Sequence, residues 1–138
     1  MSNLPTPSPA ANPETKTFWD AAAEGRLAVP RCRSCDSFIW YPRTYCPECH
    51  GRDVEWVDAS GRGTIYSYSV VRRGAAGAYA GVMPYVLAYV DLDEGPRVLT
   101  NIVDCDPDSL QIGTEVGVVF DRAPDGSALP RFRPVESE

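Results

Sequence analysis

The stretch Cys32–Gly51 reads CRSCDSFIWYPRTYCPECHG and holds four of the five cysteines in a chain of 138 residues. The four cysteines form two C-x-x-C pairs that are separated by ten residues. Three interpretations fit such a pattern: two disulfides, a four-thiolate metal site, or an attached haem, because CPECH also reads as C-x-x-C-H. The predicted architecture depends on which of the three holds.

The rest of the sequence argues against disulfides and haem. The N-terminal residues MSNLPTPSPAAN have neither the basic region nor the apolar segment of a secretory signal. No apolar run approaches the roughly 20 residues that span a bilayer. We therefore expect a cytoplasmic location, where thiols stay reduced. An attached haem requires export and an axial ligand, and His50 is the only histidine of the chain.

A metal site is the interpretation that fits best. Two C-x-x-C turns on a hairpin bring four thiolates to one point, which is the tetrahedral set that zinc prefers. Iron in a rubredoxin-like site stays an alternative, because four thiolates bind either metal. Four protein ligands fill the coordination sphere, so we expect a structural metal. The predicted ligands are Cys32, Cys35, Cys46 and Cys49.

The residue after the second cysteine of each pair carries a finer signal. In such metal-binding turns this residue is often left-handed, a conformation that glycine adopts most easily. Asp36 and His50 occupy the two positions here. Asp and His are among the non-glycine residues that tolerate this conformation best, so both are predicted to have positive φ.

The segment before the cysteines predicts a short helix. Asn12-Pro13 is typical of a helix start and Gly25 of the position after a helix end. A helix this short is not stable alone, so Phe18 and Trp19 must pack on something. They pack on the protein's own domain or anchor a partner, since exposed aromatic side chains mark interfaces.

After Gly51 the alternation of apolar and polar residues predicts an all-β domain. A helical turn is expected after Asp106-Pro107. About five strands, one of them long, fit an OB-type barrel better than a β-sandwich, which usually has about seven. The expected strands are 54–59, 64–73, 84–92, 97–104 and 114–120, with a last short one around 131–133.

The predicted architecture is therefore mainly β: a short N-terminal helix, a four-cysteine zinc ribbon and a five-stranded OB-type barrel. Residues 1–11 are rich in Pro, Ser and Ala, and we expect them to be disordered. The predicted divisions of the chain are a tail at 1–11, the helix at 12–25, the ribbon at 26–51 and the OB-fold domain at 52–138.

The sequence offers little sign of catalysis. It has no second histidine that could act as a base for Cys105, which we interpret as an ordinary loop or core thiol. The loop 74–81 is glycine-rich but lacks the strand–turn–helix context of a nucleotide site. Arg72, Arg73 and Tyr79 lie next to or within this loop, and they are candidates for contact with a ligand or partner.

The joint pattern resembles the DUF35 family of OB-fold, acyl-CoA-associated proteins with a rubredoxin-like zinc ribbon. The resemblance covers nearly the whole chain after residue 12, and no catalytic residue carries over with it. The matching stretches are FWDAAAEGRLAVPRCRSC, YPRTYCPECHG, GRGTIYSYSVV, PYVLAYVDLDEGPRVLTNIVD and LPRFRP.

This resemblance implies a non-catalytic accessory subunit that binds a thiolase-like, aldolase or acyltransferase enzyme and supports its acyl-CoA site. It also implies zinc on the four cysteines, with acyl-CoA as a ligand that Arg72, Arg73 and Tyr79 would help to hold. Whether the chain has any activity of its own stays undecided, and none is expected from it alone.

A single-stranded nucleic-acid module is the alternative, because zinc ribbons and OB-folds both serve that role. Residues 26–73 hold eight arginines against five acidic residues, and Trp56, Tyr66 and Tyr68 are candidate stacking platforms. The net charge of −6 and the acidic C-terminal half weigh against it.

Overall fold

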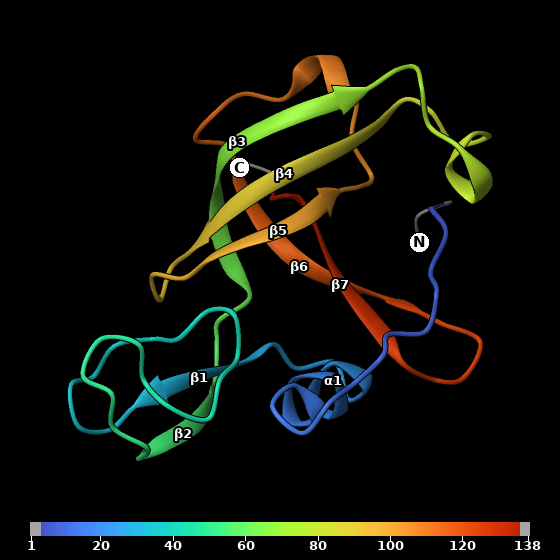
Figure 1. The fold of residues 1–138 in the computed structure, drawn as a ribbon. Helices are drawn as coiled ribbons and strands as arrows, with labels where there is room; N and C mark the ends of the chain where they lie inside the picture. Colours follow the sequence, from blue (N-terminus) through green and yellow to red (C-terminus); the bar gives the residue numbers. More distant parts are fainter. Residues whose placement is uncertain (1–3, 136–138) are drawn as a thin grey trace.

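Five strands close into a barrel in the computed structural model, which describes residues 4–135 (Figure 1). The neighbouring strands follow the order β3-β4-β5-β7-β6. All neighbours are antiparallel except β5 and β7, which pair in parallel at Ile102 and Phe132. This arrangement confirms the predicted OB-type barrel. The strands are β3 (Arg62–Val71), β4 (Tyr85–Leu92), β5 (Arg97–Ile102), β6 (Glu115–Arg122) and β7 (Ala128–Pro134).

Alternate residues of these strands fill the interior, as the period of two predicts. On β4 the buried residues are Val86, Ala88, Val90 and Leu92. Gly63 is required where β3 passes β4, because an added Cβ would lie 2.5 Å from the Asp91 carbonyl oxygen. The last strand, β7, is longer than the sequence suggested because it pairs along its whole length with β6.

The ribbon is a separate two-stranded sheet of β1 (Ala28–Cys32) and β2 (Val54–Asp58). The strand expected at 54–59 was predicted to belong to the barrel, and that prediction is wrong. β2 pairs antiparallel with β1, with Cys32 opposite Val54. Local alternation identifies a strand but not its partner, and here the metal-binding loop between β1 and β2 brings them together.

The helix α1 (Lys16–Ala23) packs against β1, β6 and β7. It begins later than predicted, because residues 13–15 form a turn whose amides the Asn12 side chain caps at 2.9 and 3.0 Å. Gly25 follows the helix with φ of 80°, as expected for its position. No helix within residues 4–135 is long and apolar enough to cross a membrane.

Residues 4–11 run as an extended segment beside the barrel before the chain reaches α1 (Figure 1). The expectation of disorder does not hold for them. Leu4 is buried, and the Pro5 carbonyl accepts a hydrogen bond of 2.6 Å from Arg131. Residues 1–3 of the expected tail lie outside the described residues.

Two short 3-10 turns occupy the loops of the barrel. The turn Pro107–Ser109 follows Asp106, whose carboxylate accepts from the Asp108 amide at 3.0 Å, so the predicted helical turn is confirmed. The turn Gly77–Tyr79 lies within the glycine-rich loop between β3 and β4.

Candidate functional site

The four predicted metal ligands meet at one point. The sulfur atoms of all four cysteines lie within 4.8 Å of one another, and two pairs are 3.6 Å apart. Four sulfurs bound at about 2.3 Å from a tetrahedral metal are separated by about 3.8 Å. The donor set therefore fits a four-thiolate structural metal. The close pairs are Cys32 with Cys49 and Cys35 with Cys46.

The backbone turns that present these thiolates are left-handed where the sequence predicted it. Asp36 has φ of 62° and His50 has φ of 64°. Their amides donate hydrogen bonds of 2.8 Å to the carbonyls of Cys32 and Cys46, respectively. The prediction for both residues is confirmed, and the two halves of the site have equivalent turns.

The electrostatics of the cluster favour a cation. Hydrogen bonds from the Ser37 hydroxyl and amide lower the pKa of Cys35 to about 6, so this thiol is readily ionised. The Gly51 amide lowers the pKa of Cys49, but the neighbouring sulfurs and burial outweigh it and raise that pKa to about 11. Four thiolates this close repel one another, and a bound cation would remove that repulsion.

The helix aromatics pack mainly on the protein itself. Phe18 is 4% exposed, and its ring contacts Trp19 at 4.8 Å and Trp40 at 5.4 Å between centroids. Phe18 is therefore not available as a partner anchor, and Trp19 is partly buried against the same core. A hydrophobic helix residue in the sequence does not reveal whether its own domain covers it.

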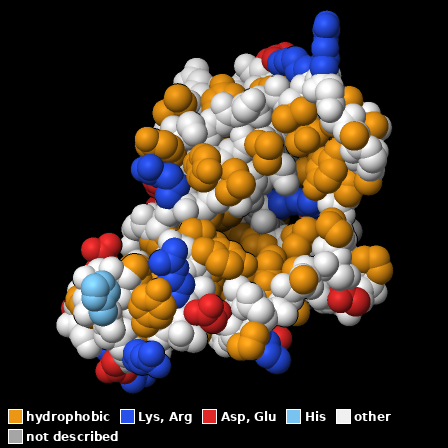
Figure 2. Space-filling model, viewed as in Figure 1, with side chains coloured by type: hydrophobic (Ala, Val, Ile, Leu, Met, Phe, Trp, Pro, Cys, Tyr) orange, Lys and Arg blue, Asp and Glu red, His pale blue; other side chains and the backbone are white. Residues whose placement is uncertain are grey.

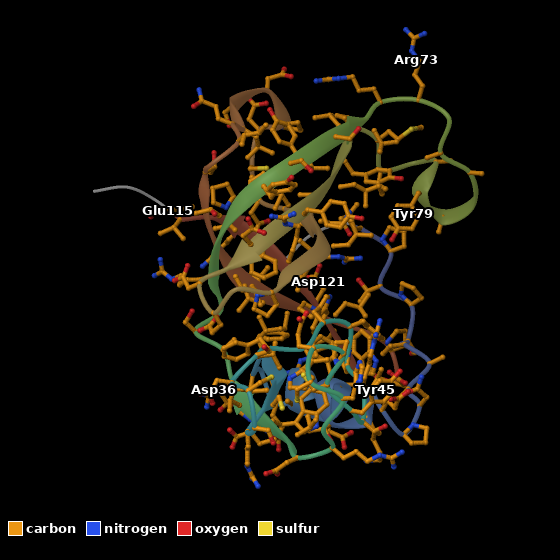
Figure 3. The ribbon with its side chains drawn as sticks, turned by 60° about the vertical axis from the view of Figure 1, so that its left-hand side comes forward. Asp36, Tyr45, Arg73, Tyr79, Glu115 and Asp121 are labelled. Carbon is orange, nitrogen blue, oxygen red and sulfur yellow. The ribbon has the colours of Figure 1, made fainter. Side chains whose placement is uncertain are left out.

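The structure does not bring Arg72, Arg73 and Tyr79 together. Arg72 pairs with Asp108 at 2.7 Å. Arg73 projects away from the body of the protein, whereas Tyr79 lies lower on the same loop (Figure 3). The Tyr79 ring packs against Tyr85 with centroids 5.1 Å apart.

The rings proposed for nucleic-acid stacking do not form a common exposed row. Trp56 and Tyr68 are half-buried and pack against the core, and the Tyr68 hydroxyl donates to the Leu110 carbonyl at 2.8 Å. Tyr66 is exposed, with the Arg97 guanidinium 3.4 Å from its ring centroid. The structure therefore does not favour this alternative.

The fifth cysteine lies apart from the metal-binding cluster. Cys105 is half-buried in the loop after β5. Burial raises the pKa of its thiol, and the charges of Asp106 and Asp104 raise it further. The thiol is therefore less nucleophilic than an ordinary cysteine at neutral pH, which agrees with its interpretation as a loop thiol.

An exposed apolar surface on the barrel was missed by the sequence analysis. Alternation buries one face of β4 and leaves Leu87 and Tyr89 on the other, with Tyr89 directly opposite Leu99 of β5. With Tyr66 of β3 these residues form the surface that we call the outer face. Hydrophobic side chains gather on this side of the barrel (Figure 2). The sequence did contain a sign of this exposed surface, because the residues of β4 are apolar on both faces of the strand.

A buried ion pair was also missed. Arg131 of β7 and Asp121 of β6 point out of the barrel, yet their side chains are 3% and 9% exposed and lie 2.7 Å apart. Asp121 lies low on the barrel, toward the helix and ribbon (Figure 3). The alternation of β7 predicts an outward arginine, and nothing local indicates that the N-terminal segment covers it.

Two families match adjoining parts of the chain. Residues 19–55 match the family described as ChsH2, rubredoxin-like zinc ribbon domain. Residues 56–121 match the family described as ChsH2, C-terminal OB-fold domain. The two matches coincide with the metal-binding segment and with most of the barrel.

Curated relatives cover most of the chain. A DUF35 domain-containing scaffold protein of Methanothermobacter thermautotrophicus is 44% identical over 68% of this chain and 71% of its own length. The benzoylsuccinyl-CoA thiolase subunit BbsA of Thauera aromatica is 32% identical over 94% of both chains. A probable enoyl-CoA hydratase alpha subunit of Thermomonospora curvata is 38% identical over 93% of this chain. The chain spans only 40% of that relative's length.

A solved structure shares the fold along nearly its whole length. A chain of the Ltp2-ChsH2(DUF35) aldolase superposes with a TM-score of 0.83 at 38% identity, covering 92% of this chain and 98% of that one. With its four-cysteine ribbon, its OB-type barrel and these matches, the chain belongs to the DUF35 family.

Proposed function

We propose that this protein is a non-catalytic accessory subunit that binds a thiolase-like enzyme and supports its acyl-CoA site. The observation that carries the proposal is the match over 98% of a chain in the Ltp2-ChsH2(DUF35) aldolase. The similarity to BbsA, a benzoylsuccinyl-CoA thiolase subunit, extends over 94% of each chain and points to the same class of partner. Both relatives are named as parts of enzymes that act with a second protein or subunit.

The outer face is the proposed docking surface on this subunit. Tyr66, Leu87, Tyr89 and Leu99 are each more than a third exposed and come from three adjacent strands. Contiguous exposed apolar side chains on a small protein mark interaction sites, and aromatic residues are enriched at the centre of interfaces. Arg97, held by Asp91 at 2.6 Å, adds a rigid polar edge beside Tyr66.

The experiment is to mix the metal-loaded protein with a thiolase-like enzyme from the same source and measure the dissociation constant by calorimetry. We expect Leu87→Asp and Tyr89→Asp each to weaken binding at least about tenfold, because each buries a charge without a partner. Ile112→Asp is the matched control, since Ile112 is exposed outside the outer face.

Two results would count against this function. Absence of any complex with thiolase-like partners would remove the accessory role itself. Equal loss of binding in Leu87→Asp and Ile112→Asp would keep the role but exclude the outer face as the docking surface.

Zinc is the proposed metal, in a cytoplasmic location where the thiols stay reduced. The four-thiolate set fits zinc and iron alike, and the match to a rubredoxin-like zinc ribbon supports zinc. Metal analysis of the purified protein decides between them: a colourless sample with one zinc per chain is expected, and a red, iron-containing sample would indicate a rubredoxin-like carrier.

Acyl-CoA is proposed as the ligand that the subunit shares with its partner. The relatives named as benzoylsuccinyl-CoA thiolase and enoyl-CoA hydratase subunits support this class of ligand. Of the three loop candidates, Tyr79 lines an apolar crevice beside the barrel, where it would contact the uncharged acyl part of such a ligand and not its phosphates.

A further inference from the structure

An apolar crevice of about 270 Å³ lies between the ribbon and the barrel. One wall is aromatic and comes from α1 and the ribbon loop, with Trp19, Trp40 and Tyr41. The other comes from the seam between β5 and β7, where Leu99 and Pro130 lie. Figure 2 shows a hollow lined by hydrophobic side chains between the two parts of the molecule. Its size is close to the lower end for small-molecule sites.

The crevice suits a neutral group. Arg131 is the one arginine or lysine among its described lining residues, and its guanidinium already donates to the Asp121 carboxylate at 2.7 Å. No aspartate or glutamate lies among those lining residues. A charged ligand group would thus be desolvated there without a counterion, which is costly. Aromatic walls favour a flat or ring-shaped occupant.

Residues 4–9, which we call the strap, run beside the crevice and contribute Pro7 to its lining. The pyrrolidine ring of Pro7 is thus one of the apolar groups that line the crevice. The strap is held beside the crevice by Arg131, which donates to the Pro5 carbonyl at 2.6 Å and the Thr6 hydroxyl at 3.1 Å. Leu4 is buried beyond it and lines a second cavity together with Ile102 and Pro84.

The composition of the strap explains why it forms a wall and not a sixth barrel strand. Pro5, Pro7 and Pro9 have no amide hydrogen, so one edge of the strap lacks the donors that a ladder with β5 or β7 would need. Prolines also favour an extended conformation, which lowers the entropy lost when the strap is held in place. Side-chain contacts therefore fix its position.

We propose that this crevice binds an uncharged aromatic or alicyclic group, and that the strap, fixed by Arg131, forms one of its walls. The site needs no partner enzyme, so it is tested separately from the accessory function. Its lining comes from the helix and ribbon on one side, from the barrel on the other, and from Pro7 of the strap. The site therefore forms only when the whole chain is folded.

The test is a fluorescence titration of the full, metal-loaded chain with the neutral probe N-phenyl-1-naphthylamine. We expect saturable binding that weakens at least about fivefold in Leu99→Asp and in Tyr41→Ser, one residue from each facing wall. Ile112→Asp and Tyr45→Ser repeat these substitutions at exposed positions outside the crevice and should leave binding unchanged.

The strap is tested in the same titration with Pro7→Gly, which removes the ring that lines the crevice, and with Leu4→Asp, which disrupts its buried end. Both should weaken binding, whereas Pro9→Gly, outside the lining, should not. Circular dichroism and metal content verify that each variant is folded. Probe binding that is absent, equally reduced in wall and control variants, or unaffected by both strap variants would overturn the proposal.

Discussion

His50 illustrates how a single residue constrains the metal-binding turn. It has φ of 64°, and its amide donates to the Cys46 carbonyl at 2.8 Å, which closes the turn. A β-branched side chain is strained in this conformation by about 1–2 kcal/mol or more. We therefore expect His50→Val to lower the free energy of unfolding by about that amount in denaturant titrations of the metal-loaded protein.

His50→Gly is the control, because glycine adopts positive φ without steric cost. It should be clearly less destabilising than His50→Val. Equal destabilisation by both substitutions would mean that the imidazole itself, rather than the backbone conformation, is what the turn requires.

Cys105 allows a test of pH dependence at a single thiol. Burial and the neighbouring aspartates raise its pKa, so at pH 8 less of it is thiolate than of an ordinary cysteine. Iodoacetamide should therefore alkylate it more slowly than free cysteine, with a rate that is still rising above pH 9. Peptide mass spectrometry of the metal-loaded protein measures this rate.

Asp106→Asn removes one of the charges that raise this pKa. The variant should react faster than the native protein at pH 8 and show its rate increase at lower pH. An unchanged dependence of the alkylation rate on pH would mean that restricted access alone slows the reaction of Cys105.

The ribbon is the element whose stability we expect to depend on the metal. Cys32 and Cys46 share a small buried cluster with Ile39, separate from the main core. We predict that Cys46→Ser abolishes metal binding and unfolds the loop between β1 and β2, while the barrel stays folded. Hydrogen exchange should show lost protection at Ile39 and His50 and retained protection at Val90 in β4. Chelation should have the same effect.

Cys105→Ser is the matched control for this prediction, because it makes the same substitution outside the cluster. It should keep its metal and its protection pattern. Loss of protection throughout the barrel in Cys46→Ser would contradict the separation. The structure does couple the two parts, because Leu27 and Val29 before the loop belong to the main core, so those two residues should keep partial protection.

Which segments form strands was easier to predict than which strands pair with each other. Periodicity identified the strands, since alternation along β4 and β5 is imposed by one buried face. It could not assign β2 to β1, because strand pairing is set by residues far apart in sequence. Asp36, His50 and Gly25 were predicted well because backbone conformation at these positions depends on local chemistry.

At the scale of the whole molecule, the helix and the strap pack against the barrel, whereas the four cysteines lie in a separate small cluster of the ribbon. Surfaces were the part that the sequence could not locate. The composition of residues 4–11 predicted disorder, yet Leu4 is buried and the Pro5 carbonyl accepts a hydrogen bond from Arg131 of β7. Phe18 was expected either to pack on its own domain or to anchor a partner, and it is buried, whereas Leu87 and Tyr89 are exposed. Which face is covered depends on tertiary packing.

The central claim is that the outer face of this subunit docks on a thiolase-like enzyme. Hydrogen–deuterium exchange of the protein alone and in the presence of that enzyme tests it most directly. We expect slower exchange in β4 and β5, with the metal-binding loop unchanged. A complex whose protection is confined to the ribbon, with β4 and β5 exchanging as in the free protein, would contradict it.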